Sequence, residues 1–68
     1  MKTFKIEGDY IELNKLLKAA GLAENGAAAG FAIASGKVKV DGEMELRKRR
    51  KIRPGQEIVY GASTVRTE

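Results

Sequence analysis

The chain contains no cysteine and no histidine. Without cysteine, neither a disulfide framework nor a thiolate zinc site can hold the fold together. Without histidine, the chain lacks the commonest general base and the commonest metal ligand. Because it has only 68 residues, we expect a single domain, residues 1–68, whose stability comes from a small apolar core and good local propensities.

Long hydrophobic runs are also missing. No apolar stretch approaches the length of a membrane-spanning helix, and the N-terminus does not lead into a segment that would suggest a signal peptide. We therefore expect a cytoplasmic protein with no membrane partner, which the lack of cysteine permits. We also expect a monomer.

The side chains that catalysis would need are absent or are better explained by other roles. A nucleophile requires an activating base, and Asp9 and Asp41 are better placed to cap a helix and to form a turn. Glu43 and Glu45 stand two positions apart beside many cations, which would keep both carboxylates ionised instead of tuning them for proton transfer. We expect a protein that is not an enzyme and that uses neither a metal nor a cofactor.

Positive charge is concentrated in one quarter of the chain. The formal net charge is +4, yet residues 37–53 hold eight basic and three acidic side chains, whereas the remainder holds five basic and six acidic ones. The densest part, residues 47–53, is called the basic run here, and six of its seven side chains are basic. Such crowding is repulsive unless a polyanion neutralises it, so the run predicts contact with phosphates, with RNA as the leading candidate.

The first half of the chain predicts a short strand and two helices. Residues 3–7 alternate between apolar and polar side chains, which is typical of a half-buried strand. Asp9, with Glu12 three residues later, predicts a capping box at the start of the first helix. The apolar stripe of this helix is made by Leu13, Leu16, Leu17 and Ala20. A second helix is expected over residues 26–35, started by Asn25 or Glu24, with Ala29 and Ile33 facing the core. Its alanines suit a close approach of two helices, which favours an αα-hairpin.

The second half predicts short antiparallel strands. A valine-rich strand leads into Asp41-Gly42, a strong hairpin signal. We expect a three-residue loop that pairs Val38 with Met44, because a two-residue turn would put charged side chains opposite the apolar face.

The pattern is completed by a turn at residues 53–56, with proline second and glycine third, a strand at 57–60 and a frayed strand at 64–66. The fold class is α+β, with an αα-hairpin packed on a small antiparallel sheet.

This order of motifs resembles the S4-like RNA-binding domain. The resemblance rests on the two helices, Gly21-Leu22 between them, Val-Lys-Val-Asp-Gly at residues 38–42, the basic run and Pro54-Gly55, and it covers about residues 10–59. The stand-alone length and the stretch 36–50 are especially similar to the short YbcJ-like bacterial members. The resemblance implies the S4-like fold, or αL motif, and a non-catalytic protein that grips structured RNA, ribosomal or transfer RNA, in ribosome assembly or translation.

Carried over by position, the resemblance implies RNA contacts at Lys37, Lys39, Arg47, Lys48, Arg49 and Arg50. Lys51 and Arg53 are added to these candidate RNA contacts because they are basic and lie in the same run. Lys15 and Lys18 on the first helix are weaker candidates and are better explained as ordinary exposed lysines. The second helix departs from the family, because it carries no charge and has Gly30 where a basic residue is frequent. We therefore expect the basic run to carry more of the binding than in relatives.

Other interpretations of these residues stay open. Most charge runs are solvated surface. The chain could also be a protein-interaction module whose basic face binds an acidic protein or an anionic membrane surface. Tyr10 and Tyr60 could stack on bases, but their positions at the ends of elements favour packing at the edge of the core. We expect Phe4 and Phe31 to be packing residues as well. Phe31 has no clear partner in the pattern, so an exposed position is the alternative for it.

Overall fold

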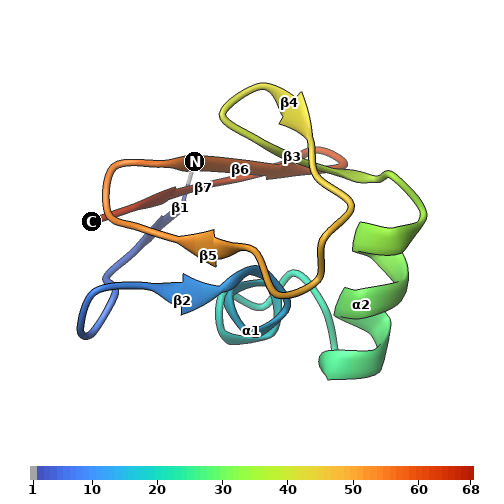
Figure 1. Cartoon of the computed structure of the whole chain (residues 1–68), viewed down its shortest axis with the longest axis horizontal. Coiled ribbons are helices and arrows are strands. Elements are labelled where there is room, and N and C mark those ends of the chain that lie inside the picture. Colours follow the sequence, from blue (N-terminus) through green and yellow to red (C-terminus); the bar gives the residue numbers. More distant parts are fainter. Residues whose placement is uncertain (1) are drawn as a thin grey trace.

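The computed structural model describes residues 2–68, and Figure 1 shows the arrangement of its elements. In chain order they are β1 (Lys2–Phe4), β2 (Ile11–Glu12), α1 (Leu13–Ala19), α2 (Gly26–Ala34), β3 (Val38–Val40), β4 (Glu43–Met44), β5 (Lys51–Ile52), β6 (Glu57–Tyr60) and β7 (Ser63–Thr67). Within this range one sheet has the strand order β1-β7-β6-β3-β4, and β2 pairs with β5 in a separate antiparallel ribbon. The helices and the β2–β5 ribbon lie on the same side of the larger sheet.

The predicted α+β class is confirmed, including the αα-hairpin, in which α1 packs against α2. The sheet differs from the expected antiparallel arrangement at one edge, where β1 runs parallel to β7. Between residues 2 and 68, neither helix is long and apolar enough to cross a membrane.

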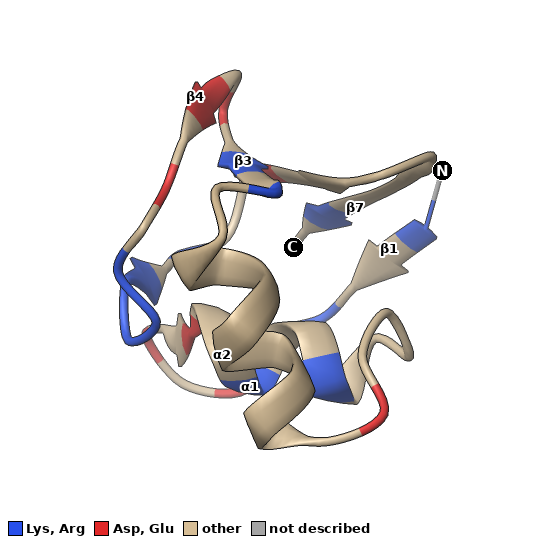
Figure 2. Ribbon diagram, turned by 90° about the vertical axis from the view of Figure 1, so that its right-hand side faces the viewer, with Lys and Arg blue, Asp and Glu red and all other residues tan. Residues whose placement is uncertain are grey.

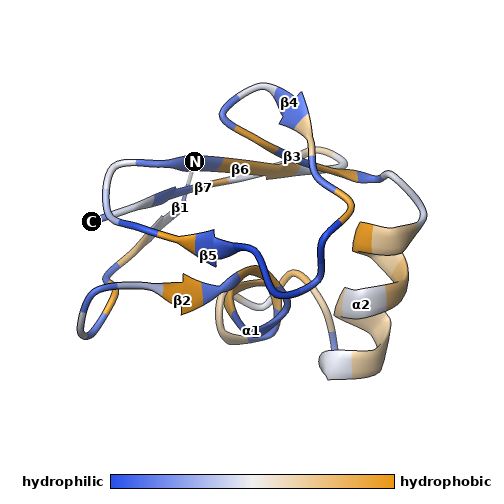
Figure 3. Ribbon diagram, in the orientation of Figure 1, coloured by the Kyte–Doolittle hydropathy of each residue, from blue (hydrophilic) through white to orange (hydrophobic). Residues whose placement is uncertain are grey.

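The core forms where both helices face the sheet. The predicted stripe of α1 is confirmed, and α2 adds the predicted Ala29 and Ile33, both fully buried. From the strands and loops the core receives Ile6, Val38, Val40, Ile52 and Ile58. Phe4 and Tyr60 pack against its edge as predicted. In Figure 3 the central strands β3 and β6 are largely hydrophobic, whereas most of the chain between β4 and β5 is hydrophilic.

The start of α1 differs from the prediction. Glu12 is the N-cap residue but its side chain caps nothing, and the expected capping box with Asp9 does not form. Instead, the amide of Leu13 donates to the carbonyl oxygen of Arg50 (2.9 Å), and the amide of Asn14 donates to that of Lys48 (3.0 Å). Because β2 leads directly into α1 and pairs with β5, the backbone before β5 lies close to the start of the helix. Its carbonyl groups can therefore accept hydrogen bonds from the first amides of α1. The other helix follows its prediction, since the side chain of Asn25 accepts from the amide of Ala28.

The register of the β3–β4 hairpin also differs from the prediction. Lys39 pairs with Met44, so the connection is a two-residue turn and not the expected three-residue loop. Asp41 (φ 52°) and Gly42 (φ 85°) both have positive φ, as a type I′ turn requires. The charge penalty that argued against this register is not incurred, because β4 is an exposed edge strand and Met44 itself is 60% exposed. Apolar pairing therefore does not set the register here.

The C-terminal part is more regular than expected. The turn at residues 53–56 is confirmed, with Gly55 at φ 91° in its third position. The predicted final strand is not frayed, because β7 lies between β1 and β6 and pairs with both.

Replacing Asp41 by alanine should lower the free energy of unfolding by about 1–3 kcal/mol. The Asp41 carboxylate accepts from the amide of Glu57 and from the side chain of Gln56, both at 2.9 Å, and alanine disfavours positive φ. Asp41→Asn, which tolerates this conformation, should lose less. Urea unfolding followed by circular dichroism measures both changes. Glu43→Ala, at the exposed end of the same hairpin, is the control, and an Asp41→Ala variant as stable as this control would refute the assigned turn.

Candidate nucleic-acid interface

The basic run lies along the N-terminal end of α1. After β4, residues 45–50 have no regular structure, and the two backbone hydrogen bonds to the first turn of α1 hold this segment in place. Ile52 is its one buried side chain, and it pairs across to Ile11. Because backbone groups make the attachment, the basic side chains remain on the outside. In Figure 2 the ribbon of this segment is a blue stretch beside α2, whose ribbon carries no charged residue.

Glu45 organises the first part of this loop. Its side chain is only 8% exposed, although it lies among arginines. Arg47 binds it with two guanidinium nitrogens, Nε to Oε2 at 2.9 Å and Nη2 to Oε1 at 3.1 Å, and also donates its backbone amide to Oε2 at 2.9 Å. Arg50 donates from Nη1 to Oε1 at 2.6 Å. One nearly buried carboxylate thereby holds two arginines in a defined geometry.

These contacts lower the pKa of the Glu45 carboxyl from its ordinary 4.5 to about 2. The main cause is the hydrogen bond from the side chain of Arg47; burial opposes it, and Arg50 lowers the pKa further. This confirms that the carboxylate is held ionised by its cations and is unsuited to proton transfer.

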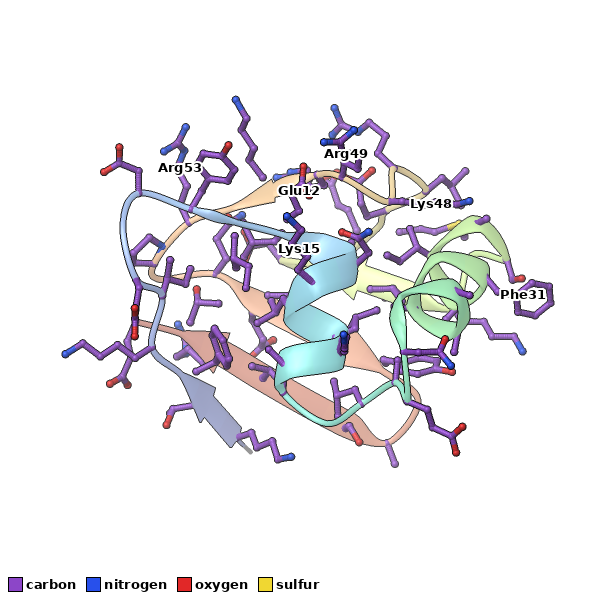
Figure 4. All side chains as sticks on the ribbon, turned by 90° about the horizontal axis from the view of Figure 1, so that it is seen from below. Glu12, Lys15, Phe31, Lys48, Arg49 and Arg53 are labelled. Carbon is purple, nitrogen blue, oxygen red and sulfur yellow. The ribbon has the colours of Figure 1, made fainter. Side chains whose placement is uncertain are left out.

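Glu12 plays a similar part in the middle of the surface. Its Oε2 accepts from Nε of Arg49 at 2.9 Å, and its Oε1 lies 3.4 Å from Nζ of Lys15. Figure 4 shows Glu12 between these two cations. The hydrogen bond from Arg49 is the largest cause that lowers the pKa of Glu12. The structure therefore joins Lys15 to the basic run, although sequence reasoning treated it as an ordinary exposed lysine. Lys18 is exposed one turn further along α1, with no carboxylate partner among the described residues.

An aromatic ring marks the far end of the run. Nζ of Lys51 lies 5.0 Å and Cζ of Arg53 5.9 Å from the ring centroid of Tyr10, within the range of cation–π attraction. Tyr10 is 41% exposed, so the prediction that it packs at the edge of the core is wrong. The ring instead orders the last two cations of the run.

Lys48 reaches from the run across α2. A Cβ atom built on Gly30 would lie 3.2 Å from Cδ of Lys48, so the side chain of Lys48 occupies the space that a larger residue in α2 would fill. Its ammonium group thereby supplies positive charge beside a helix that has none of its own (Figure 4). Phe31 on the same helix is 69% exposed, which contradicts its predicted packing role.

Lys39 does not join this surface. Val38 and Val40 point into the core, so Lys39, between them, points to the opposite face of the sheet. Lys37 is exposed where the chain enters β3. The helices and the basic run lie on the core side of the sheet, as Figure 2 shows. Of the predicted contacts, Lys39 therefore lies on the other face of the sheet from the basic run.

The resulting surface is open and positively charged. A shallow hollow of about 430 Å³ is lined by Arg47, Arg49, Arg50 and Lys51. Among residues 2–68, no group of histidine, cysteine, aspartate or glutamate side chains is placed to hold a metal ion. The arrangement can bind an extended anion at several points.

Sequence reasoning missed the organising roles of Glu12 and Glu45. Glu45 precedes Arg47 by two positions, so an acidic residue inside a basic segment was a usable signal. Glu12 and Arg49 are 37 positions apart, and no local pattern connects them.

Three comparisons with known proteins agree with one another. The family model described as the S4 domain matches residues 4–68. The Escherichia coli (strain K12) protein named "Putative RNA-binding protein YbcJ" is 47% identical over 66 residues, which cover 96% of this chain and 94% of that protein, and YbcJ of Shigella flexneri matches equally well. The solution structure of Escherichia coli YbcJ, described as revealing an alfaL motif involved in RNA-binding, is similar with a TM-score of 0.77 and 46% identity, covering 98% of this chain and 86% of that one.

Stability should fall as the pH drops from about 4.5 to about 2. The folded pKa of Glu45 lies below its ordinary value, so its contribution is complete above pH 4.5 and is lost as the carboxylate is protonated. Glu45→Gln should remove a contribution on the order of 2 kcal/mol at neutral pH and flatten this part of the profile. Urea unfolding at a series of pH values measures it. An unchanged slope in Glu45→Gln would contradict the assigned ion pairs.

Proposed function

We propose that this chain, which belongs to the S4 domain family, is a non-catalytic RNA-binding protein that grips folded RNA with the basic run. Its relative in Escherichia coli carries RNA binding in its name, and the solved structure of that relative is described in the same terms. The fold that presents the basic run is shared with it over nearly the whole chain.

One observation carries the proposal: the basic run is fixed on folded backbone and not on a mobile tail. Its attachment to α1 and its pairing as β5 give the cations defined positions around an open hollow. Arginine outnumbers lysine in the run, and the planar guanidinium can bind phosphate at two points or stack on an unpaired base. A surface of this kind fits the backbone of an RNA whose phosphates are also fixed.

We propose that the RNA contacts are Arg47, Lys48, Arg49, Arg50, Lys51 and Arg53, together with Lys15. Lys37 and Lys39 contribute only to an RNA that reaches around the β3–β4 edge, because Lys39 faces away from the run. We propose ribosomal or transfer RNA as the ligand, in the cytoplasm and in ribosome assembly or translation, since fixed cations are best used on folded RNA. The basic face is also compatible with an acidic protein or an anionic membrane, and the experiment below separates these partners.

Two double variants with the same change in charge test which face binds. Lys48→Ala/Lys51→Ala should weaken binding to a folded RNA at least tenfold, because charge-assisted contacts are among the stronger ones. The matched control, Lys37→Ala/Lys39→Ala, should change the affinity less than threefold. None of these lysines has a carboxylate partner among the described residues, so the fold should persist. Fluorescence anisotropy at several salt concentrations measures the affinity. For the wild type we expect a log–log slope on the order of −3 to −4, from four or five phosphate contacts.

Further ligands decide between the partner classes. Duplex DNA, an acidic polypeptide and vesicles containing anionic lipid are titrated beside the RNA. Tight binding to vesicles or to the polypeptide with no binding to RNA would refute the proposed function. Equal losses in the two double variants would refute the assigned face.

A further inference from the structure

Two acidic side chains lie inside the most basic surface of the molecule. Glu45 and Glu12 together bind four cations, namely Arg47, Arg50, Arg49 and Lys15. Each carboxylate reduces the attraction that this surface exerts on a polyanion. A surface that attracts polyanions by net charge alone would bind them more tightly without these two carboxylates. Their placement therefore needs another explanation.

The geometry leaves these arginines able to bind while they are held. Arg47 uses Nε and Nη2 toward Glu45, and Arg50 uses Nη1. A guanidinium has five N–H donors, so Nη1 of Arg47 and Nε and Nη2 of Arg50 have no side-chain partner among the described residues and remain available to phosphate oxygens. Arg49 uses only Nε toward Glu12. The carboxylates thus orient the guanidinium groups without occupying all of their donors.

We propose that Glu45 and Glu12 are positioning residues that make this surface select folded RNA over single-stranded RNA. The inference rests on the proposed function. A long side chain loses conformational freedom when it is immobilised by a ligand, and here that loss occurs on folding instead. Folded RNA, with fixed phosphate positions, gains from cations that are already in place. A flexible single strand can adapt to mobile cations and gains less.

A purely structural role makes a different prediction. If the two carboxylates only relieve repulsion between arginines, the removal of either one raises the net charge by one and strengthens binding to every RNA alike. The ratio of the affinities for folded and single-stranded RNA is therefore the informative quantity, because neither stability nor net charge changes it.

The experiment compares Glu12→Gln and Glu45→Gln with the wild type on two probes, an RNA hairpin and a polyuridine strand of equal length. Fluorescence anisotropy at two salt concentrations gives the affinities. Glu24→Gln is the matched control, since it makes the same change in charge in the connection between the helices. In each of the two test variants we expect affinity for the hairpin to fall about threefold to tenfold, while affinity for polyuridine stays equal or rises. Glu24→Gln should leave the ratio unchanged.

The outcomes can be told apart. The side chain of Glu12 is less buried than that of Glu45 (16% against 8% exposed), so Glu12→Gln decides the question even if circular dichroism shows that Glu45→Gln unfolds. A Glu12→Gln variant that binds both probes more tightly by the same factor, or that shows the ratio of Glu24→Gln, overturns the positioning role and leaves the proposed function standing. A wild type that binds neither probe overturns both.

Discussion

The attachment of the basic run to the first turn of α1 is the constraint on which the candidate site depends. The amides of Leu13 and Asn14 need acceptors because they begin a helix, and the carbonyl groups of Arg50 and Lys48 provide them. This contact brings residues 48–50 beside Glu12 and aligns β5 with β2. One backbone requirement, the satisfaction of a helix N-terminus, therefore places the cations.

The electrostatics of the surface follow from that placement. Six basic side chains in seven positions would repel one another, and the structure balances them locally with Glu45 and Glu12 and with the ring of Tyr10. A carboxylate at the start of α1 is also favourable next to the helix dipole. The protein thus keeps a high density of positive charge by placing five of the six cations of the run beside a carboxylate or an aromatic ring. The remaining donors of the three arginines bound to carboxylates have no side-chain partner among the described residues. The same arrangement accounts for the low pKa of Glu45.

The sequence allowed much of the fold to be predicted, because the signals involved are local. The stripe on α1, the Asn25 cap, the strands at residues 38–40 and 57–60 and the turn at Pro54-Gly55 all depend on neighbours in the chain. The predictions failed where segments that are distant in the chain can make the same contact. Asp9 had the right spacing to cap α1, but the carbonyl groups of the basic run took that role.

The candidate site was less predictable than the fold for the same reason. The basic run was evident from composition, yet its organisation depends on contacts that no local pattern reports. The predicted register of the β3–β4 hairpin depends on an apolar face. β4 is an exposed edge strand and does not have such a face. The alternation of Val38, Lys39 and Val40 already implied that Lys39 faces away from the core. Only the position of the run in the helix layer showed that Lys39 and the run lie on different faces.

The central claim is that folded RNA binds the basic run where it is attached to α1. The most direct measurement is an NMR titration of the ¹⁵N-labelled protein with an RNA hairpin. The account predicts that the largest amide shift changes fall on residues 47–53 and 12–15. Changes concentrated on residues 37–39 and 57–60, which lie at the larger sheet and outside the basic run, would contradict it.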